Sequence, residues 1–311
     1  MSAARKRRDP RLRDFVRTKS ASMRALLQTV EKVLDHDVHL LLLGESGVGK
    51  DYFAEAIHAC GARREKPLVR IDCAAIPADL FEAELFGFEK GTFTDAQARK
   101  LGKLEMALGG TVYFDDVAAL VPNLQAKLLR AIQEKRFTRL GGHESIEFDA
   151  RIISSSNVDP ETLLASGGFR RDLFYRINVV TLTVPPLRDR REDIPQLAKA
   201  FVARRKRGID DAAMKLLVEY RWPGNLRELR NAIDRAVLIE ESEVITAKSL
   251  PPFESDVLGA AEQQRWTLEE LEAQYIRQIL RLTRSNFSRA ARILGINRKT
   301  LLEKRKKYGI E

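Results

Sequence analysis

A glycine-rich turn that joins a short apolar run to a predicted helix is the stretch of this chain most able to do chemistry. Residues 38–43 are apolar except for His39, which is typical of a buried parallel strand, and a helix is expected to begin near Lys50. Glycines here let backbone N–H groups converge on phosphate oxygens, and Lys50 adds positive charge at the outer phosphates. The pattern G-x-x-x-x-G-K predicts a phosphate-binding loop of Gly44, Glu45, Ser46, Gly47, Val48, Gly49, Lys50 and Asp51. Its last residue is Asp51 in place of the usual Ser or Thr, so the usual hydroxyl ligand for magnesium is missing.

Two carboxylates follow a later predicted strand. Residues 111–114 form a short strand-like run, and Asp115 and Asp116 come directly after it. A nucleotide-bound Mg²⁺ needs a carboxylate at such a position, so Asp115 is predicted to bind the metal and Asp116 to polarise the attacking water. Asn157, which ends the next predicted strand, could hold that water from the other side, although alone it fits an Asn-Val turn better. Together with Lys50, these residues predict nucleotide hydrolysis.

Two arginines could complete such a site from outside. Arg170 and Arg176 lie in the segment GGFRRDLFYRINVV. An arginine that reaches the γ-phosphate of a neighbouring subunit stabilises the transferred charge and couples hydrolysis to assembly. The alternative is a structural ion pair with Asp172 or Glu192, and the sequence does not separate the two uses.

Predicted strands alternate with predicted helices along the first part of the chain. This alternation indicates an α/β fold in which helices cover both faces of a parallel sheet. Residues 193–240 have a helical pattern throughout, which predicts a helical subdomain, and residues 249–265, with little periodicity, predict a linker. A chain of 311 residues suits about two domains.

The charge of the chain is concentrated at its ends. Residues 1–19 hold eight Lys and Arg against two Asp, and residues 297–307 hold six against one Glu, out of a net charge of +10. Basic ends favour contact with a polyanion such as nucleic acid, although residues 1–19 could equally form a solvated arm. No apolar run approaches the ~20 residues of a membrane span. Two cysteines without metal-ligand spacing fit a reduced cytoplasm and do not fit a zinc site.

The last segment predicts a DNA-binding domain. Thr267 and Glu270 form a capping box before a helix that extends to Leu282. Two shorter helices, at about 288–294 and 297–307, are separated by Gly295-Ile296, which is helix-turn-helix spacing. We expect a small core of Ile293, Leu294, Leu301 and Leu302, with Asn297, Arg298, Lys299, Lys304 and Arg305 facing outward. The alternative is an ordinary basic pair of helices.

The motifs together resemble one family. From about Ser20 to Pro252 the chain resembles the AAA+ domain of sigma-54-dependent activators, the bacterial enhancer-binding proteins, and its last helices look like the Fis-type domain found at the C-terminus of these activators. The shared segments, in the family's order and spacing, are GESGVGKD, CAAIPADLFEAELFGFEKGTFTDA, GGTVYFDD, FRRDLFYRINV, VPPLRDRREDI and WPGNLRELRN. The implied organisation is a basic arm (1–19), an AAA+ P-loop α/β subdomain (20–185), an AAA+ helical lid (186–250), a linker (251–265) and a small all-α Fis-type domain (266–311).

The resemblance implies a role for each matching residue. Residues 44–51 would be the Walker A loop, where the family often ends in an acid, and Asp115 and Asp116 would be Walker B. Asn157 would be the first sensor and Arg227 the second, while Arg170 and Arg176 match the trans-acting arginines. The loop that contacts sigma-54 would be Gly91, Thr92, Phe93, Thr94, Asp95 and Ala96, with Phe93 and Thr94 as its contact pair. The DNA-binding residues would be Ser288, Arg289, Asn297, Arg298, Lys299, Thr300 and Lys304, of which Arg298, Lys299 and Thr300 would contact bases or phosphates.

Four positions depart from the family pattern. Thr92 replaces Ala and Asp95 replaces Gly in the contact loop, where Asp95 adds charge at the tip. Asp116 replaces the Walker B Glu and is one methylene shorter, which predicts slower hydrolysis. Asp72 replaces an Asn that can switch that glutamate in the family.

The resemblance therefore predicts a cytoplasmic bacterial transcription activator that uses ATP and Mg²⁺. Dimers formed through the helix of residues 267–282 would bind enhancer-like double-stranded DNA and assemble into a hexameric or heptameric ring. ATP hydrolysis between subunits would move the Phe93 loop against RNA polymerase holoenzyme with sigma-54 and remodel its closed complex at the promoter.

Two alternatives remain open at this point. The chain could be a DNA-binding regulator that uses ATP to control oligomerisation without acting on sigma-54, or a general AAA+ remodelling enzyme whose basic ends bind nucleic acid. Since no response-regulator domain precedes residue 20, we expect control by a separate partner, ligand or expression level.

Overall fold

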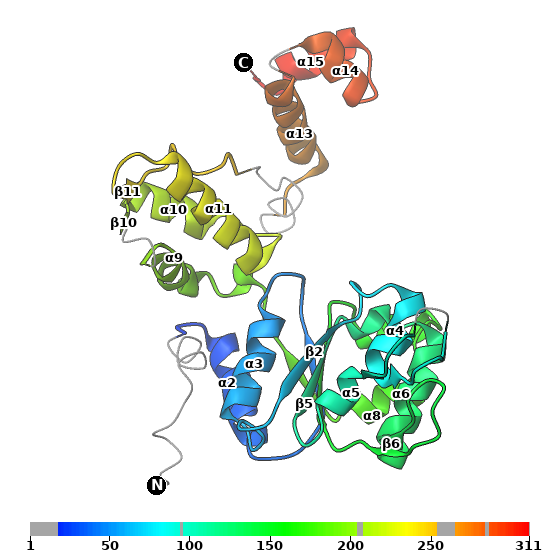
Figure 1. Ribbon diagram of the computed structural model, residues 1–311. Coiled ribbons are helices and arrows are strands. Elements are labelled where there is room, and N and C mark those ends of the chain that lie inside the picture. Colours follow the sequence, from blue (N-terminus) through cyan, green and yellow to red (C-terminus); the bar gives the residue numbers. More distant parts are fainter. Residues whose placement is uncertain (1–17, 94–95, 204–207, 254–264, 284–285, 311) are drawn as a thin grey trace. The chain divides into compact units, whose positions relative to one another are not determined.

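A computed structural model describes residues 18–93, 96–203, 208–253, 265–283 and 286–310 (Figure 1). Contacts divide the chain into two units, Met1–Pro251 and Pro252–Glu311. Residues 1–17 of the predicted basic arm, Thr94 and Asp95 of the predicted contact loop, and residues 254–264 of the predicted linker lie outside the described residues. Within the described ranges, no helix is both long and apolar enough to cross a membrane.

The first unit is built on a five-stranded parallel sheet, which confirms the predicted α/β fold. The strand order is β2-β5-β8-β1-β9. The strands are β1 (Leu40–Leu43), β2 (Leu68–Asp72), β5 (Thr111–Asp115), β8 (Arg151–Ser156) and β9 (Val180–Thr183). Because parallel strands end at the same edge of a sheet, the neighbouring strands β1, β8 and β5 deliver their following loops to one place.

Helices cover both faces of this sheet (Figure 1). In β1, the side chains of Leu40 and Leu42 lie in the core on one face of the sheet and that of Leu41 in the core on the other face. This alternation is expected from the two-residue period of a strand. The helices on the first face are α2 (Ala21–Val33) and α3 (Lys50–Cys60). Those on the second face are α4 (Ala78–Phe86), α5 (Lys103–Met106), α6 (Pro122–Glu134), α7 (Pro160–Ala165) and α8 (Arg171–Ile177). Burial on both faces explains why β1 is apolar without interruption.

Strand β2 differs from its prediction. Residues 68–71 are predicted to form a buried strand, but β2 is an edge strand that pairs only with β5. Leu68 and Val69 are consequently half-buried, and within β2 only Ile71 is fully buried. The edge position leaves the side chain of Arg70 half-exposed beside the end of β5.

Two short hairpins extend from the second face. β3 (Gly87–Phe88) pairs antiparallel with β4 (Lys100–Leu101), and β6 (Arg136–Phe137) pairs antiparallel with β7 (Ile146–Glu147). The connection of the second hairpin turns at Gly141-Gly142, where Gly141 has a φ of 69°. In the described residues of this unit, the 3-10 turns η2 (Val117–Ala119), η3 (Leu187–Asp189) and η4 (Arg191–Asp193) also connect elements.

Three helices follow the sheet. They are α9 (Ile194–Ala203), α10 (Asp211–Glu219) and α11 (Asn225–Ile239). Residues 193–240 are expected to be helical throughout. This prediction is wrong at β10 (Gly208–Ile209), which pairs in parallel with β11 (Val244–Ile245). Glycine is a poor helix residue, and α10 starts afresh at Asp210, whose Oδ1 accepts a hydrogen bond from Ala213 N at 2.6 Å.

The described part of the second unit forms the helices α13 (Leu268–Leu282), α14 (Phe287–Ile293) and α15 (Arg298–Lys307). The capping box is confirmed, because Glu270 Oε2 accepts from Thr267 N at 2.8 Å and Thr267 Oγ1 accepts from Glu270 N at 3.3 Å. The core consists of Ile276, Ile279, Leu280, Ala290, Ala291, Leu301 and Ile310. The predicted core residues Ile293 and Leu302 are instead exposed, because α13 packs on the other side of these two helices.

A half-buried histidine just before β1 makes the fold sensitive to acid. His39 Nδ1 accepts a hydrogen bond from Ile152 N at 3.1 Å, and burial, with help from Arg176, lowers the pKa of His39 to about 4. Burial also lowers the pKa of His58. Between pH 6.5 and 4 the unfolded chain therefore binds more protons than the folded chain.

We expect the contribution of His39 to the free energy of unfolding to be fully present above pH 6.5. It should be lost progressively, by on the order of 3 kcal/mol, as the pH drops to 4. Urea unfolding of the wild type and His39→Gln at pH 7 and pH 5 measures this effect. Glutamine can still accept from Ile152 N but does not titrate, so the variant should lose less stability between the two pH values. An equal loss in both proteins would contradict the assignment to His39.

Candidate functional site

The glycine-rich loop wraps around the start of α3. Gly44, Gly47 and Gly49 have φ values of 151°, 78° and 98°, a region that favours glycine. At Gly47 a Cβ would also come within 2.3 Å of Gly224 O, so the close approach of α11 requires glycine there. Lys50 Nζ donates to Gly44 O at 2.7 Å and Glu45 O at 3.0 Å, so its charge is held inside the loop. The loop has the geometry of a phosphate-binding helix N-terminus.

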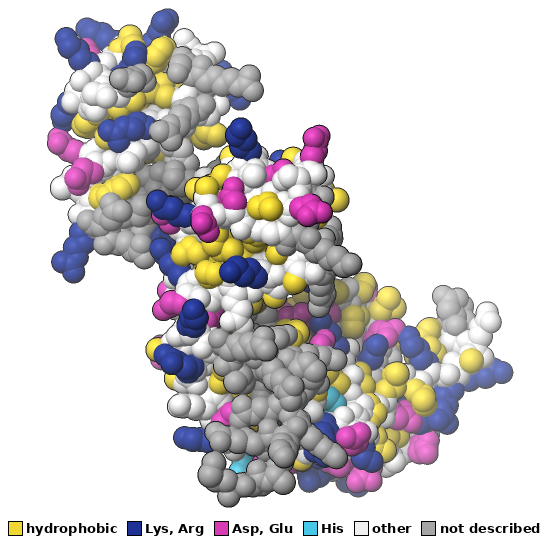
Figure 2. Space-filling model, turned by 90° about the vertical axis from the view of Figure 1, so that its left-hand side faces the viewer, with side chains coloured by type: hydrophobic (Ala, Val, Ile, Leu, Met, Phe, Trp, Pro, Cys, Tyr) yellow, Lys and Arg dark blue, Asp and Glu magenta, His cyan; other side chains and the backbone are white. Residues whose placement is uncertain are grey.

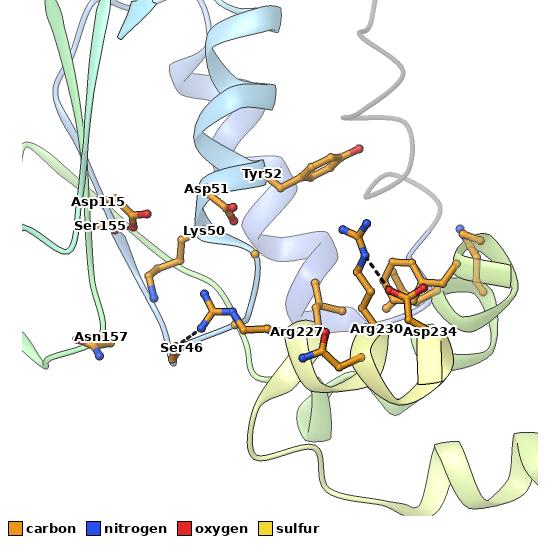
Figure 3. A pocket seen from close by; sticks show the side chains of 18 of the residues that line it. Ser46, Lys50, Asp51, Tyr52, Asp115, Ser155, Asn157, Arg227, Arg230 and Asp234 are labelled. Carbon is orange, nitrogen blue, oxygen red and sulfur yellow. Dashed lines mark hydrogen bonds and ion pairs between the residues drawn. The ribbon is translucent and has the colours of Figure 1, made fainter. Parts of the chain in front are cut away.

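A cavity of about 1600 Å³ opens at this edge of the sheet (Figure 3). It brings together predicted residues from four segments that are far apart in sequence. They are Ser46, Gly47, Gly49, Lys50, Asp51, Asp115, Asp116, Asn157 and Arg227. Arg227 extends from α11 and its Nη1 donates to Ser46 Oγ at 3.0 Å, so the lid helices contact the loop directly (Figure 3).

Asp115 is held by three side chains that the sequence interpretation did not assign. Its Oδ1 accepts from Ser155 Oγ at 2.8 Å and from Tyr113 Oη at 3.1 Å, and its Oδ2 is ion-paired with Arg70. Burial opposes ionisation, but the hydrogen bonds from Ser155, Arg70 and Tyr113 hold the pKa of Asp115 below its usual value. The carboxylate is thus charged and oriented before any ligand binds.

Asp116 has a different environment. Its φ is 56°, a left-handed conformation that Asp tolerates, and its N–H donates to Ser155 Oγ at 2.9 Å. Its Oδ1 is buried and has no hydrogen-bond partner within the described part of the chain. Burial raises the pKa of Asp116, and Asp115 and Asp72 add to this effect against the charge of Lys50. A buried unpaired carboxylate oxygen is suited to bind a water molecule or a cation.

Asp72 is occupied with its own backbone. Its Oδ1 accepts from Ala74 N at 3.1 Å and from Ala75 N at 3.0 Å, which caps the turn after β2. Asp72 therefore stabilises this turn, and it adds negative charge near Asp116.

A clamp on Glu45 fixes the loop from the lid side. Arg188 donates to its carboxylate through Nη2 at 2.6 Å and Nη1 at 2.8 Å, and Asn225 Nδ2 donates to Glu45 Oε2 at 3.1 Å. Asn225 Nδ2 also donates to Ser46 O at 3.1 Å. Arg188 and Asn225 lie in the motifs VPPLRDRREDI and GNLREL, which are visible in the sequence, but their partner becomes clear only from the fold.

Arg170 and Arg176 lie outside the cavity. Arg170 precedes α8, and its Nη2 lies 2.7 Å from Asp172 Oδ2. This is the structural ion pair that the sequence offers as the alternative to a role at a neighbouring subunit. Arg176 is exposed near the end of α8, and the described residues include no ion-pair partner for it. The chain passes from α8 directly to β9, which starts beside Leu40. Arg176 thus lies toward the edge of the sheet opposite Lys50, and it cannot reach the cavity of its own subunit.

The predicted contact loop is anchored to the second hairpin. Thr92 Oγ1 lies 2.6 Å from Glu89 O and 3.0 Å from Leu140 O, and Gly91 N donates to Ala96 O at 2.8 Å. The ring of Phe93 packs 4.7 Å from that of Phe88 but stays 44% exposed. Buried Arg139 binds Glu89 at 2.8 Å, which fixes the base of the loop.

Replacing Thr92 by Val should loosen this anchor. The isosteric side chain cannot donate to Leu140 O, so we expect faster amide hydrogen exchange in residues 87–93 and 136–147 and a stability loss of about 1 kcal/mol. Thr92→Ser keeps the hydroxyl and should behave like wild type. Thr181→Val removes the exposed hydrogen bond to Asn178 and is the matched control. Unchanged exchange in Thr92→Val would show that the hydroxyl does not link the two segments.

The second unit presents basic residues on α14 and α15. Ser288, Arg289, Arg298 and Lys299 are exposed, while Thr300 is half-buried at the start of α15. Asn297 caps α15, and its Oδ1 accepts from Thr300 N at 2.8 Å. Lys304 pairs with Glu272 of α13 at 2.7 Å, and Arg305 stacks 5.2 Å from Phe287, so both also stabilise the fold. At the top of Figure 2, Lys and Arg side chains surround exposed hydrophobic ones on this unit.

Family models cover most of the chain. The model described as "Sigma-54 interaction domain" matches residues 16–183, the AAA+ ATPase lid domain matches residues 188–265, and "Bacterial regulatory protein, Fis family" matches residues 267–308. The chain belongs to the sigma-54-dependent activator family. The resemblance inferred from its motifs is confirmed, and so is the AAA+ fold with a lid and a helix-turn-helix domain. The activator therefore acts in sigma-54-dependent transcription, with an ATP-binding ATPase domain and a DNA-binding helix-turn-helix.

Relatives and solved structures agree with this membership. The activator is 44% identical over 298 residues to the transcriptional regulatory protein ZraR of Klebsiella oxytoca, covering 92% of this chain and 67% of ZraR. It is 40% identical over 311 residues to the regulatory protein AtoC of Escherichia coli K12, which covers 94% of this chain and 68% of AtoC. A crystal structure of NtrX from Brucella abortus in complex with ATP is similar, with a TM-score of 0.69 and 36% identity over 94% of this chain and 69% of NtrX.

Proposed function

We propose that the activator binds ATP with Mg²⁺ in the cavity beside Lys50 and hydrolyses it in a homo-oligomeric ring. In this account Lys50 Nζ leaves the carbonyl oxygens of its own loop and binds the phosphates. The Arg227 side chain, which already contacts the loop, reports the nucleotide to the lid. Asp116 and Asn157 position the attacking water. The single observation that supports this most strongly is the convergence of these side chains on one cavity.

The residues present fit magnesium. In ATPases this ion takes one or two carboxylates, with phosphates and water filling the other positions. The described ranges contain no cluster of three or more His, Cys, Asp or Glu that could hold a metal alone, so the phosphates would have to complete its coordination. Asp115 would hold the ion, with Asp51 beside it. The bound ion would neutralise charge that develops on the transferred phosphoryl group.

Subunit contact completes the site in this proposal. Arg176, and Arg170 once released from Asp172, would reach the γ-phosphate of a neighbouring subunit, since α8 lies away from the cavity of its own chain. Hydrolysis would then depend on assembly, and the ring would have six or seven subunits.

DNA binding would use a dimer. Leu268, Tyr275 and Leu282 follow a seven-residue spacing along α13 and are 84%, 47% and 61% exposed. Such a stripe is suited to pack against a second copy of the helix. Arg298, Lys299 and Thr300 at the start of α15 would then contact enhancer-like double-stranded DNA, with Ser288, Arg289, Asn297 and Lys304 beside them.

Phe93 and the adjacent Thr94 would contact sigma-54 in the RNA polymerase holoenzyme. The test is open-complex formation at a sigma-54-dependent promoter with wild type, Phe93→Ala and Leu80→Ala. Leu80 is an equally apolar side chain, 57% exposed on α4, and serves as the control. Wild type and Leu80→Ala should open the promoter with ATP, and Phe93→Ala should not. ATP turnover and DNA binding without opening by any of the three proteins would instead favour a regulator that uses ATP only to control oligomerisation.

A further inference from the structure

An arginine occupies the space between two carboxylates of the nucleotide site, those of Asp51 and Asp115. Arg70 extends from the edge strand β2 and lines the cavity beside Lys50. Its Nη2 is ion-paired with Asp115 Oδ2, and its Nη1 lies 3.6 Å from Asp51 Oδ2. The guanidinium lies 5.7 Å from the centroid of the Tyr113 ring. One planar side chain thus bridges the last residue of the phosphate loop and the carboxylate at the end of β5.

This bridge joins two features of the chain: the acidic residue that ends the phosphate loop and an arginine on the edge strand. Asp51 stands where the phosphate-loop motif usually has a hydroxyl, so the site has two facing carboxylates in place of a carboxylate and a hydroxyl. Without a cation, these carboxylates would repel the phosphates of an incoming nucleotide. The guanidinium supplies a positive charge that is always present, because arginine does not lose its proton in proteins.

The bridge is also easy to open. The side chain of Arg70 is 46% exposed and that of Asp51 51%, while Asp115 is 24% exposed. Ion pairs as accessible to water as this one contribute little to stability, which excludes a dominant structural role. Asp115 would keep its hydrogen bonds from Ser155 and Tyr113 if Arg70 moved away. The carboxylate can therefore exchange one cation for another without losing its orientation.

We infer that Arg70 is a positioning residue that competes with Mg²⁺ for Asp115. This inference rests on the proposed Mg–ATP site. In the nucleotide-free chain Arg70 offsets part of the negative charge of Asp51 and Asp115, and Mg²⁺ gains access to Asp115 only when the Arg70 ion pair opens. Arg70 consequently raises the Mg²⁺ concentration needed for tight nucleotide binding, and it supports weak binding when the metal is absent.

The experiment measures the affinity of the full chain for a fluorescent ATP analogue, first in EDTA and then across a Mg²⁺ titration. In EDTA, Arg70→Ala should bind more weakly than wild type by about two- to fivefold, because Asp51 and Asp115 lose the positive charge that lies between them. In the titration, Arg70→Ala should reach half-maximal affinity at about two- to fivefold lower Mg²⁺, because the competitor is gone. Arg70→Lys keeps the charge but cannot bridge both carboxylates, so its Mg²⁺ midpoint should lie between the other two.

Arg64→Ala is the charge-matched control, since Arg64 is a half-exposed arginine that pairs with Glu65 outside the cavity. It should match wild type in both conditions. If wild type responds to Mg²⁺ and Arg70→Ala has the same Mg²⁺ midpoint, the role of Arg70 is overturned while the metal site stands. Nucleotide binding that ignores Mg²⁺ in both proteins would overturn the metal site as well. Failure of wild type to bind the analogue would contradict the nucleotide site itself.

Discussion

Replacement of Lys50 by Ala should lower ATP affinity by about 100-fold or more. The Lys50 ammonium is enclosed by the glycine-rich loop, where it donates hydrogen bonds to two backbone carbonyl oxygens. When ATP binds, its phosphate oxygens would replace these carbonyl oxygens as the acceptors. Each charge-assisted hydrogen bond lost in such a site costs about 1.5–3 kcal/mol. In the variant, the positive charge of Lys50 would also no longer offset the repulsion between the phosphates and the carboxylates of Asp115 and Asp116. Isothermal titration with ATP measures the loss.

Lys66→Ala is the matched control, because Lys66 is an exposed lysine outside the cavity. It should bind ATP as wild type does, and both variants should melt near the wild-type temperature. ATP binding by Lys50→Ala within a fewfold of wild type would show that the loop is not the phosphate site.

Replacement of Arg176 by Ala should lower ATP turnover by about 1,000-fold while ATP affinity stays nearly unchanged. An arginine supplied by a neighbour to the transferred phosphoryl group contributes about 10³–10⁵ in rate. Arg176 is exposed, lies outside its own cavity and forms no ion pair within the described ranges, so its loss should not disturb the fold. Turnover and nucleotide affinity of the assembled protein measure the two effects separately. Arg171→Ala, an exposed neighbour on α8, is the control and should retain turnover.

Mixing two inactive variants distinguishes action between subunits from action within one. At ATP concentrations that saturate only the intact site, a Lys50→Ala subunit holds little nucleotide but still offers Arg176, and an Arg176→Ala subunit still binds ATP. Mixed oligomers should therefore recover a measurable fraction of turnover. No recovery in oligomers shown to contain both variants would mean that Arg176 acts on the site of its own subunit.

The sequence predicts well whatever is fixed locally. Glycines at 44, 47 and 49 specify the loop because the backbone there adopts positive φ, and Leu40 to Leu43 specify a strand buried on both faces. Once these strands are parallel neighbours, Asp115 and Asn157 must come near Lys50. This part of the candidate site needs no knowledge of side-chain packing.

The sequence predicts poorly whatever depends on packing between remote segments. The Arg188 clamp on Glu45 forms only when η3 approaches the loop, and the Arg70 bridge forms because β2 is an edge strand next to β5. Ile293 and Leu302 have the spacing of core residues, but helices as short as α14 and α15 do not define their buried faces until α13 packs against them. Charged pairs between distant elements leave no periodic signal in a single sequence.

ATP turnover per subunit as a function of protein concentration tests the central claim most directly, with wild type and Asp116→Glu measured side by side. If an assembled ring completes the site with arginines from a neighbour, turnover per subunit should rise steeply with concentration. Asp116→Glu, which extends the carboxylate by one methylene toward the water, should rise at the same concentrations and to a higher rate. Turnover that is independent of concentration, or absent from both proteins at concentrations where they assemble, would contradict this account.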